Sequence, residues 1–305
     1  MTYQSAAISN GQTTLPHLPD WVTSARAETP ETVAFLSGAV LAHLHLVVGC
    51  PGVPQTLLRE RLALRAAEAC VTRAGRPERA GELRDAVQFL QPGDQAGPAG
   101  ETYLSWRRAV ERPISVRALH RALPTLAPEQ IATCLDGCGP YDLSGLGQGG
   151  PIVRSAAMIE TVLAEIPRET VAAQILAEAV LAKALSWEYP VPLLSAGLKR
   201  GDLRKRGDDL RLACHRAVIA SATEATRLAT DLARRAARLH GVAPKLRAKG
   251  AGEAVALFLA RDALAPSALT SLSSDRAARR FCDRLVELGV IRELTGRDTF
   301  RLYGL

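Results

Sequence analysis

The segment around residues 76 to 107 gathers side chains that could carry out acid, base or phosphate chemistry. It reads GRPERAGELRDAVQFLQPGDQAGPAGETYLSWRR, and its charged residues flank a rigid Pro/Gly turn. Such a density of carboxylates and guanidinium groups could form the site of a nucleic-acid-processing enzyme. It is also typical of a buried ion-pair network that fixes helix packing, the interpretation we favour. The residues concerned are Arg76, Glu78, Arg84, Asp85, Asp94 and Arg107.

The histidines and cysteines form no pattern typical of a metal or nucleophile site. His43 and His45 are two residues apart on an expected helix, so they point to different faces. Cys134 and Cys138 lack the CxxC spacing of zinc sites. No HExxH, phosphate-binding glycine loop or GxSxG motif is present. We therefore expect neither a metal nor a cofactor, and free thiols favour a reducing, cytoplasmic setting.

Positive charge is concentrated in the last third of the chain. Residues 1–194 carry 16 basic and 19 acidic side chains, a net charge of −3, whereas residues 195–305 carry 22 and 12, a net charge of +10. Clustered Lys and Arg attract phosphates and release their counterions. The asymmetry indicates a polyanionic partner for the C-terminal part, although a solvated basic surface would have the same composition.

The clearest helix signal lies in this basic region. Ser273 or Ser274 can cap a helix that runs to about Leu288, and Gly289 supplies its stop. Apolar residues recur on one face at helical spacing, while arginines occupy the other face in the N-terminal half. VIREL (290–294) and TFRLY (299–303) then predict two strands joined by a Thr-Gly-Arg-Asp turn.

These elements, with a short helix expected through PSALTSL, follow the order of a winged helix-turn-helix over residues 253–305. Such proteins read DNA chiefly through N-terminal residues of the second helix. Arginine can bond guanine or phosphate, and the basic loop before residue 253 could clamp the DNA backbone. The module could instead dock another protein, because Asp283 and Glu287 would repel phosphates. The expected DNA-binding residues are Arg276, Arg279, Arg280, Arg297, Lys245, Arg247 and Lys249.

Upstream, Leu-, Ala- and Val-rich periodic segments predict an almost all-α protein, because aromatic residues make up only 4% of the chain. The apolar stretch 33–48 is too short to span a bilayer, which needs about 20 residues, so we interpret it as a core helix and expect no membrane association. The expected organisation is a flexible leader (1–28), a helical domain (29–194), a charged linker (195–214), a long helix with a basic loop (215–252) and the terminal module.

Several blocks of the sequence resemble a known family. They are GRxE, LRDA, PGDxxGPAG with a following W-R, PVPLL, LARRAxRL-xVAPKLRAKGAG and SDRAARRFxDRLVELGxIRELTGRxTFRLYGL. Together they resemble an uncharacterised domain-of-unknown-function family of bacterial, often plasmid-borne proteins. The resemblance covers most of residues 20–305 and implies a bacterial cytosolic protein. It implies no catalytic role for any residue.

The sequence as a whole favours a protein that binds double-stranded DNA in transcriptional or plasmid-associated control. A nucleic-acid-processing enzyme with a site at 76–107 and a helical scaffold that docks proteins are the alternatives. We expect no enzyme activity in the favoured case, and the sequence leaves the oligomeric state open, with a homodimer as one option.

Overall fold

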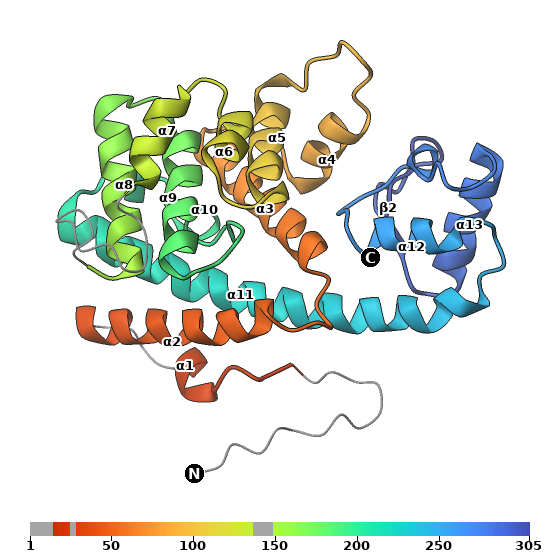
Figure 1. Cartoon of the computed structure of the whole chain (residues 1–305), viewed down its shortest axis with the longest axis horizontal. Helices are drawn as coiled ribbons and strands as arrows, with labels where there is room; N and C mark the ends of the chain where they lie inside the picture. Colours follow the sequence, from red (N-terminus) through yellow and green to blue (C-terminus); the bar gives the residue numbers. More distant parts are fainter. Residues whose placement is uncertain (1–14, 25–28, 137–148) are drawn as a thin grey trace.

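The computed structural model describes residues 15–24, 29–136 and 149–305. It is mainly helical, as the sequence predicted, and two groups of helices lie along one long helix, α11 (Figure 1). The larger group precedes α11 in the sequence and the smaller one follows it. The helices of the larger group are α1 (Asp20–Ser24), α2 (Pro30–Val48), α3 (Gln55–Arg73), α4 (Ala80–Gln88), α5 (Gly97–Glu111), α6 (Val116–Ala122), α7 (Pro128–Leu135), α8 (Pro151–Glu165), α9 (Thr170–Ala184) and α10 (Leu194–Gly197).

Helix α11 (Gly207–Val242) is longer than the sequence indicated. Its 36 residues span about 54 Å at 1.5 Å per residue. Leu210 and Cys214 are buried under the larger helix group, so the apolar stripe of α11 begins inside the expected charged linker. Asp208 and Asp209 lie in its first turn, where acidic side chains interact favourably with the positive end of the helix dipole. The expected linker therefore contains α10, the 3-10 helix η2 (Asp202–Arg204) and the first turns of α11.

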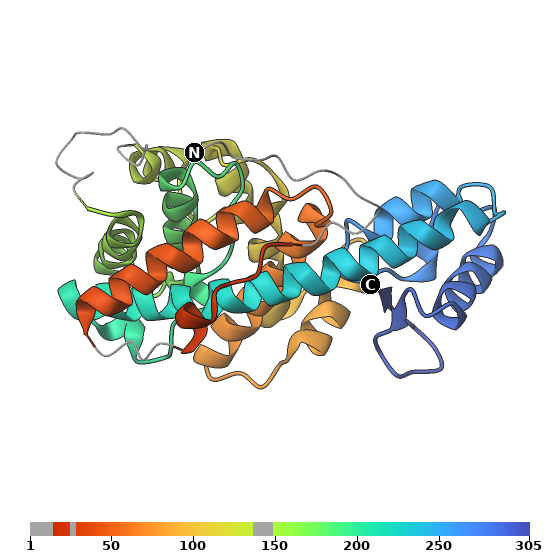
Figure 2. The same ribbon diagram turned by 90° about the horizontal axis from the view of Figure 1, so that it is seen from below.

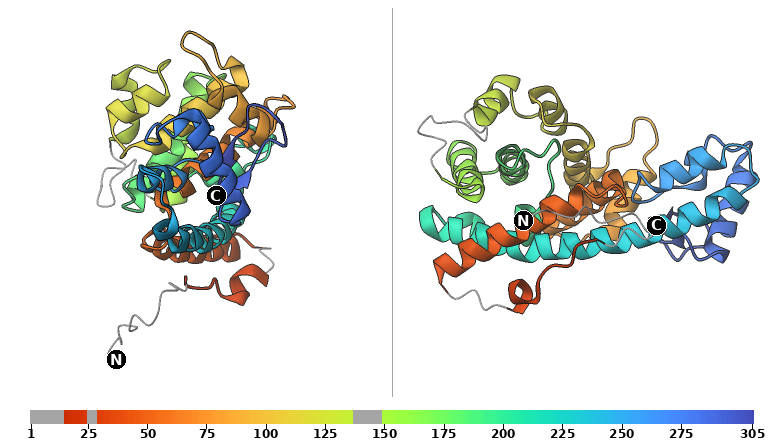
Figure 3. Two further views of the ribbon diagram at one scale, coloured as in Figure 1. Left: turned by 90° about the vertical axis from the view of Figure 1, so that its right-hand side faces the viewer. Right: turned by 60° about the horizontal axis from the view of Figure 1, so that its bottom comes forward.

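Helix α2 lies beside α11 along much of its length (Figures 2 and 3). Thr29 caps α2 by accepting a hydrogen bond from Thr32 N at 3.2 Å. Among the described residues, α2 is the one helix long and apolar enough to cross a membrane by length and composition. One of its faces is buried against the core, while Phe35 and Leu46 are exposed on the outside. Helix α2 therefore contributes one face to the hydrophobic core, and its other face is exposed.

Residues 15–24 of the expected leader lie within the described part of the chain. Residues 20–24 form α1, where Trp21 stacks on Phe35 with ring centroids 5.5 Å apart. Residues 1–14 and 25–28 of that leader lie outside the described residues. The same holds for residues 137–148.

Helices α8 and α9 pack side by side. One side of α3 is buried, with Leu57, Leu62 and Ala66 among its residues. Helices α4 and α5 pack on α3, and this places the 76–107 segment next to the C-terminal module.

The C-terminal module contains α12 (Ala251–Phe258), the 3-10 helix η4 (Pro266–Ala268), α13 (Asp275–Glu287) and an antiparallel hairpin of β1 (Arg292–Glu293) and β2 (Tyr303–Gly304). The helix expected through PSALTSL is only the 3-10 turn η4. The expected four-residue turn at 295–298 is wrong, because Glu293 pairs with Tyr303 and leaves a nine-residue loop. An isolated bridge from Leu264 to Tyr303 adds a third strand position and fixes this register.

Candidate nucleic-acid interface

Helix α13 presents arginines on the outer face that the sequence predicted. Ser274 caps the helix by accepting a hydrogen bond from Ala277 N at 3.3 Å. Ala278, Phe281, Cys282 and Leu285 are buried in the module, and the arginines expected to bind DNA are exposed. Those arginines are Arg276, Arg279 and Arg280.

A groove with a volume of about 450 Å³ runs between α13 and the segment that follows α11. Four cations line it and, of the described residues that line it, none is acidic. We call it the basic groove. Its floor is apolar, with Phe281 and Leu246 among its residues. The four cations are Lys245, Arg247, Arg280 and Arg284.

The basic groove unites two stretches that lie apart in the sequence. Lys245 belongs to the 3-10 helix η3 (Ala243–Lys245), and Arg247 follows it, whereas Arg280 lies on α13. Arg284 also donates to Glu287 at 3.0 Å, so this cation is partly neutralised. Lys249 is exposed but does not line the groove.

Gly250 holds the basic loop against the module. Its backbone has φ +84°, a conformation that L side chains rarely adopt, and a Cβ atom there would meet the Ser271 carbonyl. Ser271 Oγ donates a hydrogen bond to Gly250 O at 3.0 Å. Glycine at this position therefore allows the two loops to approach closely enough to place Lys245 and Arg247 beside α13.

The opposite side of α13 has a small excess of negative charge. A cavity of about 560 Å³ between α13, the hairpin loop and the end of α4 is lined by three carboxylates, those of Asp275, Asp283 and Asp298, and also by Arg301. Arg279 lines this acidic cavity rather than the basic groove. The structure thus separates Arg279 from Arg280, which the helical projection had grouped on one surface.

The hairpin loop rests on the larger helix group. Arg297 donates to Asp85 on α4, and Phe300 packs edge-on against Phe89 with ring centroids 5.8 Å apart. A phosphate would have to replace Asp85 to reach Arg297. The predicted contact of Arg297 with DNA stays a prediction, and the basic groove does not include this residue.

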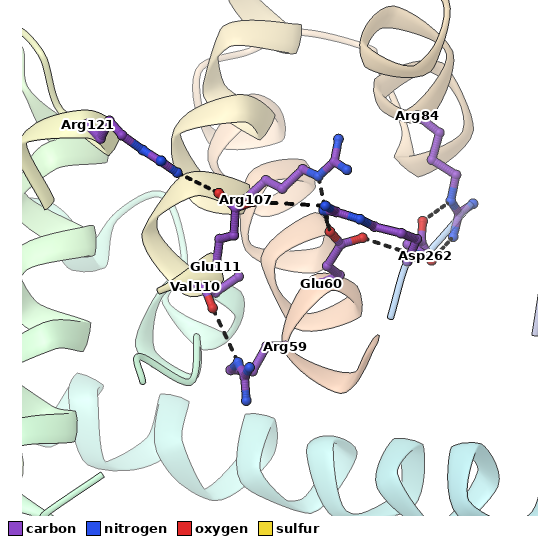
Figure 4. A network of polar contacts seen from close by, with 9 residues as sticks. Arg59, Glu60, Arg84, Arg107, Val110, Glu111, Arg121 and Asp262 are labelled. Carbon is purple, nitrogen blue, oxygen red and sulfur yellow. Dashed lines mark hydrogen bonds and ion pairs between the residues drawn. The ribbon is translucent and has the colours of Figure 1, made fainter. Parts of the chain in front are cut away.

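Two of the six residues proposed for a polar network, Arg84 and Arg107, join one buried cluster (Figure 4). Arg107 Nε donates to Glu60 Oε1 at 3.1 Å, and Arg84 donates to both carboxylate oxygens of Asp262. Asp262 N donates to Glu60 Oε2 at 2.9 Å, which links the two ion pairs. Glu60 is 4% exposed and Asp262 is 1% exposed, so a substrate has no access to either carboxylate.

Burial also shapes the electrostatics of this cluster. Arg61 forms an ion pair with Asp262, and burial nonetheless lowers the pKa of Arg61. Burial raises the pKa of Tyr103, and the charges of Asp262 and Glu60 raise it further. The arrangement is an ion-pair network between the larger helix group and the C-terminal module, and of the six residues named from the sequence it contains Arg84 and Arg107.

The remaining four residues of the proposed network lie apart from this cluster. Arg76 donates to Glu78 at 2.7 Å on the surface, and Asp85 binds Arg297. Asp94 accepts from Gln91 N at 2.9 Å within its own turn.

The partners in the cluster were not among the residues predicted from the sequence. Glu60 and Arg61 sit side by side on α3, and Arg261 and Asp262 follow α12. Arg261 Nη1 donates to Glu60 Oε1 at 2.7 Å. The available signal was the charged triplet Arg59 to Arg61 between the apolar pairs Leu57-Leu58 and Leu62-Ala63 of α3, where an unpaired buried charge would be costly.

The described residues hold no group of three or more His, Cys, Asp or Glu side chains that could bind a metal ion. A family model described as "Protein of unknown function (DUF1403)" matches residues 6–305 of the chain. No curated protein matches the sequence.

Proposed function

The chain belongs to this family of unknown function, so its activity has to be argued from its own geometry, and we propose that it binds double-stranded DNA through the C-terminal module. The proposed role is transcriptional or plasmid-associated control in the bacterial cytoplasm. The single observation that carries the proposal is the basic groove, in which Lys245 and Arg247 join Arg280 of α13.

The order of elements in the module supports the proposal. Helix α12 precedes the bridge residue Leu264, then η4, α13 and the hairpin follow, which is the order of a winged helix-turn-helix. Helix α13 would then be the recognition helix, whose N-terminal residues contact bases in the major groove. Arg276 lies in its first turn and is exposed. The first helix of the motif is reduced to the 3-10 turn η4, so α13 and the groove carry more of the interface.

The charge distribution around α13 supports phosphate binding on one side. The basic groove is lined by cations on two elements, which would contact a DNA strand from both sides. Asp283 lines the acidic cavity, and Glu287 is paired with Arg284. The two carboxylates that oppose DNA binding in the sequence are therefore either turned away from the groove or partly neutralised.

The experiment is a salt titration of duplex DNA binding by fluorescence anisotropy with the full chain. The variant Lys245→Ala/Arg280→Ala should weaken binding and reduce the slope of log K against log salt by about 0.9 for each phosphate that is no longer neutralised. The control Arg227→Ala/Arg234→Ala removes the same charge from exposed positions on α11 outside the groove. Its slope should match that of the unmodified chain.

Two results would defeat the proposal. One is the absence of detectable duplex binding at low salt, which would favour protein docking by the module. The other is an equal loss of duplex affinity in the groove variant and the control. It would show that binding depends on the net charge of the chain and not on the basic groove. Recovery of specific genomic fragments by the unmodified chain, and their loss in Arg276→Ala, would assign base contacts to the start of α13.

A further inference from the structure

A second cation-lined cavity lies in the larger helix group. It has a volume of about 470 Å³ and sits where the end of α3, the start of α9 and the 3-10 helix η2 meet. This size is within the range of small-molecule sites. Its lining is apolar at Leu163, Pro167 and Leu203, and polar at Thr170 and Gln174.

Four guanidinium groups line the cavity, and none of the described residues that line it is acidic. The four are Arg73, Arg200, Arg204 and Arg206. Among the described residues, none of these four forms an ion pair that the structure records. Arg206 donates only to backbone carbonyls, those of Leu203 and Lys205. The nearby Asp202 is occupied by Lys205 at 2.6 Å. The cavity therefore concentrates positive charge without a counter-ion from the protein.

Arg73 is held rigidly at the cavity wall. Its Nη1 donates to Ser195 O at 2.7 Å and to Leu198 O at 2.8 Å. Its Nη2 donates to Gln174 Oε1 at 2.5 Å, and Gln174 itself is only 1% exposed. Its Nη2 also donates to Cys70 Sγ at 3.3 Å, so all four acceptors are neutral, and the buried Nε has no hydrogen-bond partner. The guanidinium is thus oriented in advance, with its charge uncompensated.

The buried carboxylate of Glu178, which contacts Ser195 as Arg73 does, does not supply that compensation. Glu178 Oε1 accepts from Leu193 N at 2.8 Å and Ser195 N at 3.0 Å. Burial raises the pKa of Glu178 to about 8, so this group is mainly protonated at neutral pH.

We infer that this cavity is a binding site for a small phosphorylated anion, such as a nucleoside diphosphate or pyrophosphate. Guanidinium groups bind phosphate oxygens in pairs of parallel hydrogen bonds, and Arg200, Arg204 and Arg206 could offer such pairs to a ligand with two phosphate groups. The Nη groups of Arg73 already donate to protein acceptors, so Arg73 contributes its positive charge. Helix α9 starts at Thr170 on the cavity wall, and the amide groups of its first turn favour negative charge there. A neighbouring cavity of about 840 Å³ shares Arg73 and Arg200, which leaves room for the rest of a nucleotide.

A small anion fits this site better than a nucleic-acid strand. Cys70 and Gln174 line the cavity at 6% and 1% exposure, so its inner wall reaches the buried core. The neighbouring cavity is lined by Glu68 and Glu224 in addition to its cations. A phosphate backbone that continued past Arg200 would meet these two carboxylates.

The test is isothermal titration calorimetry of the full chain with pyrophosphate and, separately, with adenosine diphosphate. Arg200→Ala/Arg204→Ala removes two exposed cavity cations that have no recorded ion pair in the described structure. It should raise the Kd for pyrophosphate by about tenfold to a hundredfold, because each substitution removes one charge-assisted hydrogen-bond donor. The control Arg117→Ala/Arg238→Ala removes equal charge from exposed positions that do not line the cavity, and its Kd should be unchanged.

Arg200→Lys/Arg204→Lys gives a second measurement, because it keeps the charge and loses the paired hydrogen bonds. Its Kd should lie between those of the unmodified chain and the alanine variant. The inference is overturned if pyrophosphate shows no saturable binding at millimolar concentration, or if the control loses as much affinity as the alanine variant. It is also overturned if a single-stranded oligonucleotide binds through Arg200 and Arg204 while pyrophosphate does not. Binding of duplex DNA through the basic groove is measured in a separate experiment. The outcome for pyrophosphate therefore does not decide the outcome for DNA, or the reverse.

Discussion

Arg84 on α4 forms a two-point contact with Asp262, with Arg84 Nη2 3.3 Å from Asp262 Oδ1 and Arg84 Nε bonded to Oδ2. Arg61 on α3 pairs with the same carboxylate and also donates to Leu305 O at 3.0 Å. The arginines belong to the larger helix group, whereas Asp262 and Leu305 belong to the C-terminal module. One buried carboxylate therefore ties the C-terminal module to the helices that precede it.

The change Asp262→Asn should lower the free energy of unfolding by about 3 to 5 kcal/mol. It leaves Arg61 and Arg84 partly buried without a carboxylate, and breaking a buried pair from one side costs about that much. Urea unfolding measures the loss. Asp298→Asn is the control, because Asp298 is fully exposed and its ion pair with Arg301 is long at 3.6 Å. A loss below about 1 kcal/mol in Asp262→Asn would contradict the role assigned to this carboxylate.

The same cluster shows what the sequence could and could not predict. Helix α13 and its cap at Ser274 follow from local signals, namely the apolar repeat and the side-chain oxygen before the first turn. Arg84 and Arg107 were named from the sequence only as two of six charged residues in a dense segment, with no signal that set them apart from the other four. Asp262 follows Arg84 by 178 residues, so no local spacing relates the two side chains.

The prediction of the hairpin turn from the sequence was wrong for a related reason. The residues 295–298 are typical of a tight turn, and locally nothing contradicts such a turn. The chain instead pairs Glu293 with Tyr303, because Leu264 bridges Tyr303 and Phe300 packs on Phe89, the residue after α4. Both contacts are tertiary, and they override the local preference.

The change Gly250→Ala should lower the free energy of unfolding by about 1 to 3 kcal/mol. The backbone there has φ +84°, and the added Cβ would press on the Ser271 carbonyl. The loop should shift away from α13, so we also expect weaker duplex binding than in the unmodified chain. Gly252→Ala is a matched control two residues later, at an exposed position in α12 with open space around its Cα. Equal stability of the two variants in thermal unfolding would refute the close approach at Gly250.

The change Asp85→Ala should increase duplex affinity slightly, because it frees Arg297 and removes a negative charge beside the module. Arg297→Ala should change duplex affinity less than Arg280→Ala, since Arg297 is already bonded to Asp85. The Arg297–Asp85 pair is partly exposed, with side chains 50% and 21% accessible, so either change should cost at most about 1 kcal/mol of stability. Anisotropy titrations of the three variants measure their duplex affinities. A larger loss of affinity for Arg297→Ala than for Arg280→Ala would indicate that DNA contacts the hairpin loop and not the basic groove.

The stability of the chain should depend on pH through Glu178. Burial raises its pKa from 4.5 to about 8, although hydrogen bonds from Ser195 and Leu193 oppose the shift. The folded chain therefore holds this proton more tightly than the unfolded chain. The contribution of protonated Glu178 to the free energy of unfolding is fully present below pH 4.5 and declines as the pH rises through 8.

Glu178→Gln keeps an oxygen acceptor for Leu193 N and cannot ionise. Its free energy of unfolding, relative to that of the unmodified chain, should therefore increase as the pH rises from 4.5 through 8. Urea unfolding at several pH values measures the difference, with the exposed Glu101→Gln as control. Parallel curves for the unmodified chain and Glu178→Gln would show that Glu178 stays charged in the folded protein.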